Sequence, residues 1–212
     1  MSRPAGVPVP ATSLQRALGF DLSSIRVWEP PLMQANLILN ELRNNLVTHV
    51  VGLPDNASAA LFSLLSWEGK PQLVTVTREG EAFAIAAGLW VGGKSPVVLI
   101  QNTGLLESGD GLRGTVMRMR IPLVCLVTYR GYSTMAGAKL APPPESLHPE
   151  ILSRPDVDSV ALLTEPTLKA WRLSYDFLIE NDDLPKISQA FRKAKESIQP
   201  TVLLIPRDLT AG

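Results

Sequence analysis

Short apolar runs alternate with segments of helical periodicity along most of the chain. The runs are rich in β-branched residues and end at glycine, proline or polar residues, as buried strands do. Strands interleaved with helices predict an α/β fold: a doubly wound, mainly parallel sheet of about six strands, with helices on both faces. The expected strands lie within 47–53, 71–76, 95–101, 121–131, 174–179 and 200–206.

Helical patterns occupy most of the intervening sequence, at 31–46, 54–69, 77–88, 164–173 and 183–198. The segment 102–120 contains four glycines and is interpreted as a glycine-broken loop that leads into a helix.

Two segments stand outside this alternation. Residues 1–30 contain prolines at intervals and are expected to form an arm, while 31–212 forms a single domain. Within that domain, 132–158 is predicted to be a long Pro-rich loop that carries His148. A loop of this length in a compact domain is usually functional or mobile.

Composition limits the possible functions. The chain has 212 residues, 45% hydrophobic and 19% charged, which is typical of a globular protein. The formal net charge is zero, which argues against nucleic acid as a partner. No apolar run approaches the ~18 residues that a membrane span needs. One cysteine, Cys125, cannot form an internal disulfide, and a cytoplasmic location is expected.

Ligands of doubly wound sheets bind beyond the carboxyl ends of the strands. In this sequence those ends are 52–56, 77–79, 101–104 and 129–131. Glu79 stands at one of them, in the first turn of a helix. A carboxylate there, Glu79 or Glu81, can simply cap the helix and favour its dipole. If the helix start faces a ligand, the same carboxylate becomes an acid–base group or hydrogen-bond acceptor.

The glycine pair around Asp110 allows several interpretations. Gly109 and Gly111 could cradle a phosphate at a helix start, or Asp110 could ligate a metal. A surface turn is favoured over both, and no metal ligands are assigned in this chain.

Several of these strand ends match one known arrangement. Together they resemble the pyrimidine-binding (PYR) domain of thiamine diphosphate-dependent decarboxylases, particularly sulfopyruvate and phosphonopyruvate decarboxylases. The resemblance covers about 47–131. It rests on the G-x-P turn Gly52–Leu53–Pro54, on Glu79 with Ala87 and Gly88, on the turn 93–96, on the QNTGL segment 101–105 and on the TYRG segment 128–131.

The resemblance implies a role for each strand end. Glu79 would activate the cofactor by hydrogen bonding to N1′ of its aminopyrimidine, and a low-dielectric crevice would strengthen that bond. Other residues are expected to contact the cofactor or to face the substrate. The cofactor set is Gly52, Pro54, Gln101, Asn102 and Thr103, and the substrate set is Asp55, Asn56 and Arg130.

The same resemblance implies that a second domain of these enzymes is absent from this chain. The pyrophosphate-binding (PP) domain of these enzymes carries G-D-G followed by asparagine, which hold Mg²⁺ and the diphosphate. Here no asparagine occurs between Asn102 and Asn181, so the G-D-G is interpreted as a decoy. A separate PP-type beta subunit is expected to supply Mg²⁺, and PYR–PYR self-association is expected through helices starting at Glu79 and near Leu105.

Three alternatives remain open. The first is a decarboxylase subunit for a small 2-oxo acid with an anionic tail, although Glu107 would repel that tail if it faced the site. The second is a non-catalytic PYR-like protein that binds thiamine diphosphate or a partner. The third is an unrelated nucleotide-binding domain in which Glu79 only caps a helix.

Overall fold

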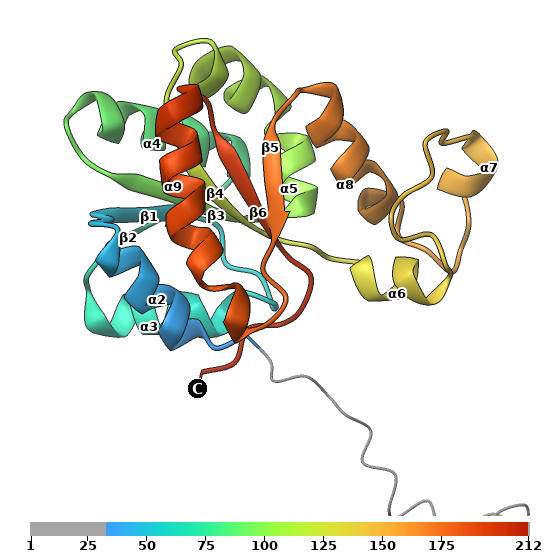
Figure 1. The fold of residues 1–212 in the computed structure, drawn as a ribbon, viewed down its shortest axis with the longest axis horizontal. Helices are drawn as coiled ribbons and strands as arrows, with labels where there is room; N and C mark the ends of the chain where they lie inside the picture. The colour runs from blue at the N-terminus through green and yellow to red at the C-terminus, as the bar shows by residue number, and fades with distance from the viewer. Residues whose placement is uncertain (1–32, 212) are drawn as a thin grey trace, which may run out of the picture. The chain divides into compact units, whose positions relative to one another are not determined.

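A computed structural model describes residues 33–211, so the N-terminal arm predicted at 1–30 lies outside the described residues. In this part of the chain six parallel strands form one sheet in the order β2-β1-β3-β4-β6-β5 (Figure 1). The prediction of a parallel, doubly wound sheet is confirmed. The strands are β1 (His49–Gly52), β2 (Gln72–Thr75), β3 (Pro96–Gln101), β4 (Val124–Thr128), β5 (Ser174–Phe177) and β6 (Thr201–Ile205).

Helices cover both faces of this sheet (Figure 1). One face carries α2 (Ala35–Asn44), α3 (Ala59–Glu68) and α9 (Pro185–Ser197). The other carries α4 (Glu79–Val91), α5 (Asn102–Glu107), α8 (Ser159–Ala170) and a π-helix, Gly111–Met117. The remaining short helices are α6 (Tyr132–Gly137), α7 (Pro149–Leu152) and a 3₁₀ turn, Asn181–Asp183.

The central strands are apolar except at their ends, because both of their faces are buried. Successive side chains point to opposite faces. Val98 and Cys125 therefore join the core under α4 and α8, whereas Val97 and Val124 join the core under α2, α3 and α9. The edge strands β2 and β5 have no fully buried residue, since each has a neighbour on one side only.

The prediction of a loop after β3 is wrong. The chain enters α5 directly at Asn102 and continues into the π-helix. Its glycines serve close packing: a Cβ at Gly111 would lie 3.0 Å from the carbonyl oxygen of Gly80 on α4. Helix breaking and tight helix–helix contact both select glycine, and local sequence does not distinguish them.

The Pro-rich segment 132–158 also has structure of its own, since it contains α6 and α7. His148 precedes α7, and its Nε2 lies 3.2 Å from the hydroxyl of Ser146. Among the described residues, no helix has the length and apolar character needed to cross a membrane.

Candidate active site

The carboxyl ends of four strands meet at one edge of the sheet and frame a depression of about 480 Å³. The strand register brings these ends together, because Gly52 pairs with Leu99, Gln101 with Thr128, and Thr128 with Ile205. The depression thus combines residues at or just beyond the ends of β1, β3, β4 and β6. Three predicted site residues line it: Asn56, Gln101 and Arg130.

Two glutamates in the first turn of α4 have different roles. The Glu81 carboxylate accepts hydrogen bonds from the backbone N–H groups of Thr77 (3.1 Å) and Arg78 (3.3 Å) and from the Thr77 hydroxyl (3.1 Å). These bonds, the Thr77 backbone bond foremost, lower the pKa of Glu81. Glu79 forms no hydrogen bond or ion pair with any residue between 33 and 211. Capping is therefore the work of Glu81.

The Glu79 side chain lies across α5. Gly104 is buried, and a Cβ there would stand only 2.2 Å from Cγ and 2.5 Å from Oε1 of Glu79. Only a glycine leaves room for the glutamate in this position. Gly52 meets a similar demand within the sheet, since its Cβ would lie 1.8 Å from the carbonyl oxygen of Leu99.

Glu107, at the end of α5, is paired. Its Oε1 lies 2.6 Å from Nη2 of Arg78, and its Oε2 accepts a hydrogen bond from the backbone N–H of Gly80 at 3.1 Å. The ion pair offsets the negative charge that was expected to oppose an anionic substrate. It also ties α5 to the start of α4, beside Glu79.

Asp55 holds the turn after β1. Its carboxylate accepts hydrogen bonds from the backbone N–H of Ala57 (2.7 Å) and from the hydroxyls of Ser58 (2.8 Å) and Thr128 (2.9 Å). The side chain therefore starts α3 and fastens it to the end of β4. Its predicted contact with substrate remains a prediction, and the observed hydrogen bonds are structural.

Asn102 is similarly occupied. Its side chain is buried and bonds to both backbone groups of Arg130 and to the Thr164 hydroxyl, at 3.0–3.1 Å. It thereby joins the ends of β3 and β4 to α8 and positions Arg130. Thr103, the next residue, donates from its hydroxyl to Gln101 Oε1 at 3.0 Å.

A buried polar cluster lies behind Arg130. The Tyr129 hydroxyl donates to the carbonyl oxygen of Ala161 at 2.8 Å, and the Tyr175 hydroxyl donates to Glu165 at 2.8 Å. Burial, together with the nearby charge of Glu165, raises the pKa of Tyr129. This cluster anchors the residue immediately before Arg130.

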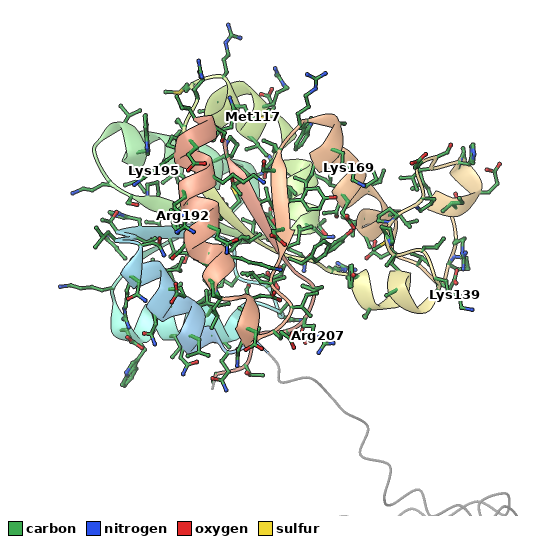
Figure 2. All side chains as sticks on the ribbon, in the orientation of Figure 1. Met117, Lys139, Lys169, Arg192, Lys195 and Arg207 are labelled. Carbon is green, nitrogen blue, oxygen red and sulfur yellow. The ribbon has the colours of Figure 1, made fainter. Side chains whose placement is uncertain are left out.

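Sequence reasoning missed Arg207, which lines the same depression. It follows β6 by two residues, as Arg130 follows β4, and Figure 2 shows it in the segment after β6. The position relative to a strand end was a usable signal. Its significance depends on β4 and β6 being neighbours, which the chain order does not reveal.

The G-D-G segment lies between α5 and the π-helix, where Asp110 forms an ion pair with Arg113 at 2.5 Å. Gly109 packs near Trp171, and Gly111 packs on Gly80. Among residues 33–211, no group of three or more His, Cys, Asp or Glu side chains is arranged to hold a metal ion.

Residues 34–149 match the family described as "Thiamine pyrophosphate enzyme, N-terminal TPP binding domain". The chain belongs to this family. The matched region includes Glu79, Gly104 and Arg130, and the predicted resemblance is confirmed. Glu79, which has no partner among the described residues, therefore lies within a TPP-binding domain.

Curated relatives carry decarboxylase names. The chain is 38% identical over 85 residues to a phosphonopyruvate decarboxylase of Streptomyces viridochromogenes, covering 40% of this chain and 21% of the relative. It is 28% identical over 94 residues to sulfopyruvate decarboxylase subunit alpha of Methanocaldococcus jannaschii, covering 44% and 56% respectively. These matches span between about a fifth and just over half of the relatives' lengths.

Solved structures support the fold. Benzoylformate decarboxylase from Polynucleobacter necessarius superposes with a TM-score of 0.55 at 20% identity, over 85% of this chain and 32% of that one. A 4-hydroxybenzoylformate decarboxylase of Rhodococcus jostii RHA1 gives a TM-score of 0.57 at 19% identity, over 82% of this chain and 30% of that one.

Proposed function

We propose that this chain is the PYR, or alpha-type, subunit of a two-subunit thiamine diphosphate-dependent decarboxylase of small 2-oxo acids. The main support for the proposal is that the two glutamates in the first turn of α4 have different partners. Glu81 caps the helix, and Glu79 is left without a partner among the described residues. A partly buried carboxylate with free acceptors can accept a hydrogen bond from the protonated ring nitrogen of an aminopyrimidine.

Glu79 holds or exchanges the proton at N1′ of the aminopyrimidine in this proposal, while Gly104 fixes the position of the carboxylate. Thiamine diphosphate, when bound, supplies the nucleophilic carbon that decarboxylation of a 2-oxo acid requires. Gly52, Pro54, Gln101, Asn102 and Thr103 remain the proposed cofactor contacts. For Asn102 the contact falls to the backbone, since its side chain is occupied.

The substrate is proposed to be a short 2-oxo acid with an anionic tail, in the manner of sulfopyruvate or phosphonopyruvate. Two kinds of support exist: relatives carry those substrate names, and Arg130 lines the depression at the strand ends. Asn56 faces the same depression. Asp55 stays in the proposed substrate set, though its carboxylate is engaged by Ser58 and Thr128.

A PP-type beta subunit is proposed to bind the diphosphate and Mg²⁺. Relatives named "subunit alpha" support the need for a second chain. So does the ion pair of Asp110 with Arg113, which occupies the one G-D-G of this sequence. The complex is proposed to act in the cytoplasm.

Self-association is proposed to use the helices that start at Glu79 and near Leu105, including the outer face of α4. Ala84, Gly88 and Val91 recur at helical spacing on this face and are exposed, with Ile85 beside them. Gly88 has open space where a Cβ would stand, so another helix can approach closely. A second copy of this chain is the proposed occupant.

The test is co-expression with a PP-type chain, followed by calorimetric titration of thiamine diphosphate with Mg²⁺ and assays with sulfopyruvate and phosphonopyruvate. Glu79→Gln should abolish turnover and retain cofactor binding, while Glu81→Gln, on the same helix turn, should keep turnover. No cofactor binding in any combination would refute the proposal. Binding without turnover of any 2-oxo acid would instead favour a non-catalytic PYR-like protein.

A further inference from the structure

We propose that the depression beyond β4 and β6 is an oxyanion-binding subsite in which Arg207 acts together with Arg130. Assigning the bound oxyanion as the tail of a 2-oxo acid substrate rests on the proposed function. The binding of an oxyanion itself does not. Arg207 thereby becomes a determinant of specificity that lies well outside the family-matched residues 34–149.

Strand register places the two arginines side by side. Thr128 of β4 pairs with Ile205 of β6, and the pairing continues as Tyr129 N–H donates to the carbonyl oxygen of Ile205 at 2.7 Å. Arg130 and Arg207 each stand two residues beyond that Thr128–Ile205 pair. Neighbouring strands lie about 4.8 Å apart. The backbones of Arg130 and Arg207 are therefore close together, and both residues line the same depression.

Arg207 is the cation at the depression that can accept an anion, because Arg130 already has a carboxylate partner. Nε of Arg130 lies 3.1 Å from Asp158 Oδ2, which orients this guanidinium while its side chain stays 61% exposed. Arg207 forms no ion pair with any residue in the range 33–211. Asp208 also lines the depression, so with Asp158 two carboxylates lie near the two arginines, and of these only Asp158 forms an ion pair with a described arginine.

Neutral polar groups complete the lining. Asn56 and Gln101 contribute amides and Ser133 a hydroxyl, all of which can donate hydrogen bonds. Two guanidinium forks next to such donors suit a group with several oxygens, because each fork can bind two oxygens at once. Phosphonate, sulfonate and carboxylate share this chemistry.

The experiment titrates methylphosphonate into the ¹⁵N-labelled full chain, observing the arginine Nε–H signals by NMR. Signals of Arg130 and Arg207 should shift together, and Arg207→Gln should weaken binding by about tenfold. The matched control is Arg192→Gln, because Arg192 is exposed on α9, away from Arg207 (Figure 2), and should leave the affinity unchanged. Backbone amide spectra of both variants establish that they are folded.

Three further measurements test the same subsite. Arg207→Lys keeps the charge without the fork and should bind with intermediate affinity. Methanesulfonate and acetate rank the oxyanions, and raising the salt concentration should weaken all of them. The subsite is overturned if methylphosphonate leaves the Arg207 signal unmoved, or if Arg207→Gln and Arg192→Gln have the same effect.

The outcome is separable from the decarboxylase proposal. Glu79→Gln should bind methylphosphonate like the unmodified chain, whatever the enzyme activity. In an active reconstituted pair, Arg207→Gln should raise KM for an anionic-tailed 2-oxo acid about tenfold and leave KM for pyruvate unchanged. Oxyanion binding without turnover would keep the subsite and refute the decarboxylase, and an unchanged KM ratio would overturn Arg207 as a specificity determinant.

Discussion

Replacing Gly104 with alanine should move the Glu79 carboxylate without changing its chemistry. The new Cβ would stand 2.2 Å from Glu79 Cγ, whereas an ordinary contact lies at 3.4–4 Å. The glutamate must therefore retreat by about 1 Å or adopt another rotamer. Glu79 has no hydrogen bond to another described residue that would resist this movement.

Two effects of Gly104→Ala on the unfolding free energy nearly cancel. A strained or altered rotamer costs about 0.5–1.5 kcal/mol, and alanine in place of glycine within a helix gains about 0.5–1 kcal/mol. The unfolding free energy of Gly104→Ala should thus change by less than about 1 kcal/mol. Turnover by the proposed two-subunit enzyme should fall about a hundredfold, as expected when the proposed catalytic group is displaced by about 1 Å.

A double-mutant cycle with Glu79→Ala isolates the contact. Without the glutamate, Gly104→Ala should stabilise the chain, giving a coupling energy of about 1 kcal/mol by urea denaturation. Gly137→Ala is the control, because a Cβ at Gly137 meets nothing within 4 Å. Additive effects of Glu79→Ala and Gly104→Ala, or full turnover in Gly104→Ala, would refute this account of how the glutamate is positioned.

Four other predictions test the surrounding structure. Cys125 should resist alkylation at pH 9 in the folded chain and react on unfolding, because burial raises the pKa of its thiol from 9.0 to about 12. Burial likewise raises the pKa of Tyr129, so above pH 10 its hydroxyl ionises in the unfolded chain before it does so in the folded chain. Folding stability should then fall by about 1.4 kcal/mol per pH unit from this group, and Tyr129→Phe should flatten the alkaline limb of a stability–pH curve. Asp55→Ala should lower the unfolding free energy by about 2 kcal/mol in chemical denaturation, since it removes a helix start and the bond to β4, whereas Asn56→Ala should change it by less than about 0.5 kcal/mol. Glu107→Gln should cost less than about 1 kcal/mol by the same measurement, because its ion pair is exposed; a larger loss would mean that the pair organises α4 and α5.

The fold followed from the sequence because the two periodicities are local. Apolar β-branched runs such as that around Val97 and Val98 are typical of strands buried on both faces, and their alternation with helices indicated a parallel sheet. The segment after β3 escaped this reasoning. Gly104 and Gly111 indicated a broken helix locally, but they are there to admit Glu79 and the backbone of Gly80.

Strand ends alone were enough to predict that Arg130 and Gln101 lie at the depression, where the structure has them, while their contacts with substrate and cofactor remain predictions. The resemblance selected Glu79 over Glu81, but the sequence could not show that the Glu81 carboxylate turns back to the Thr77 backbone and caps the helix. Sequence reasoning also missed Arg207, because its relation to Arg130 depends on β4 and β6 being neighbours although α6 to α9 separate them in the chain. Side-chain partnership and strand adjacency are both tertiary properties.

The strand order also constrains the sequence of events during folding. β5 pairs with β6 alone, and β6 is the last strand of the described chain. β5 and one edge of β4 therefore stay unpaired until β6 has formed. Such non-local pairing slows folding and leaves strand edges open for longer. The other four strands, in the order β2-β1-β3-β4, can assemble beforehand. Arg130 and Arg207 would then meet only when β6 inserts, so that anion recognition emerges with the final step of assembly.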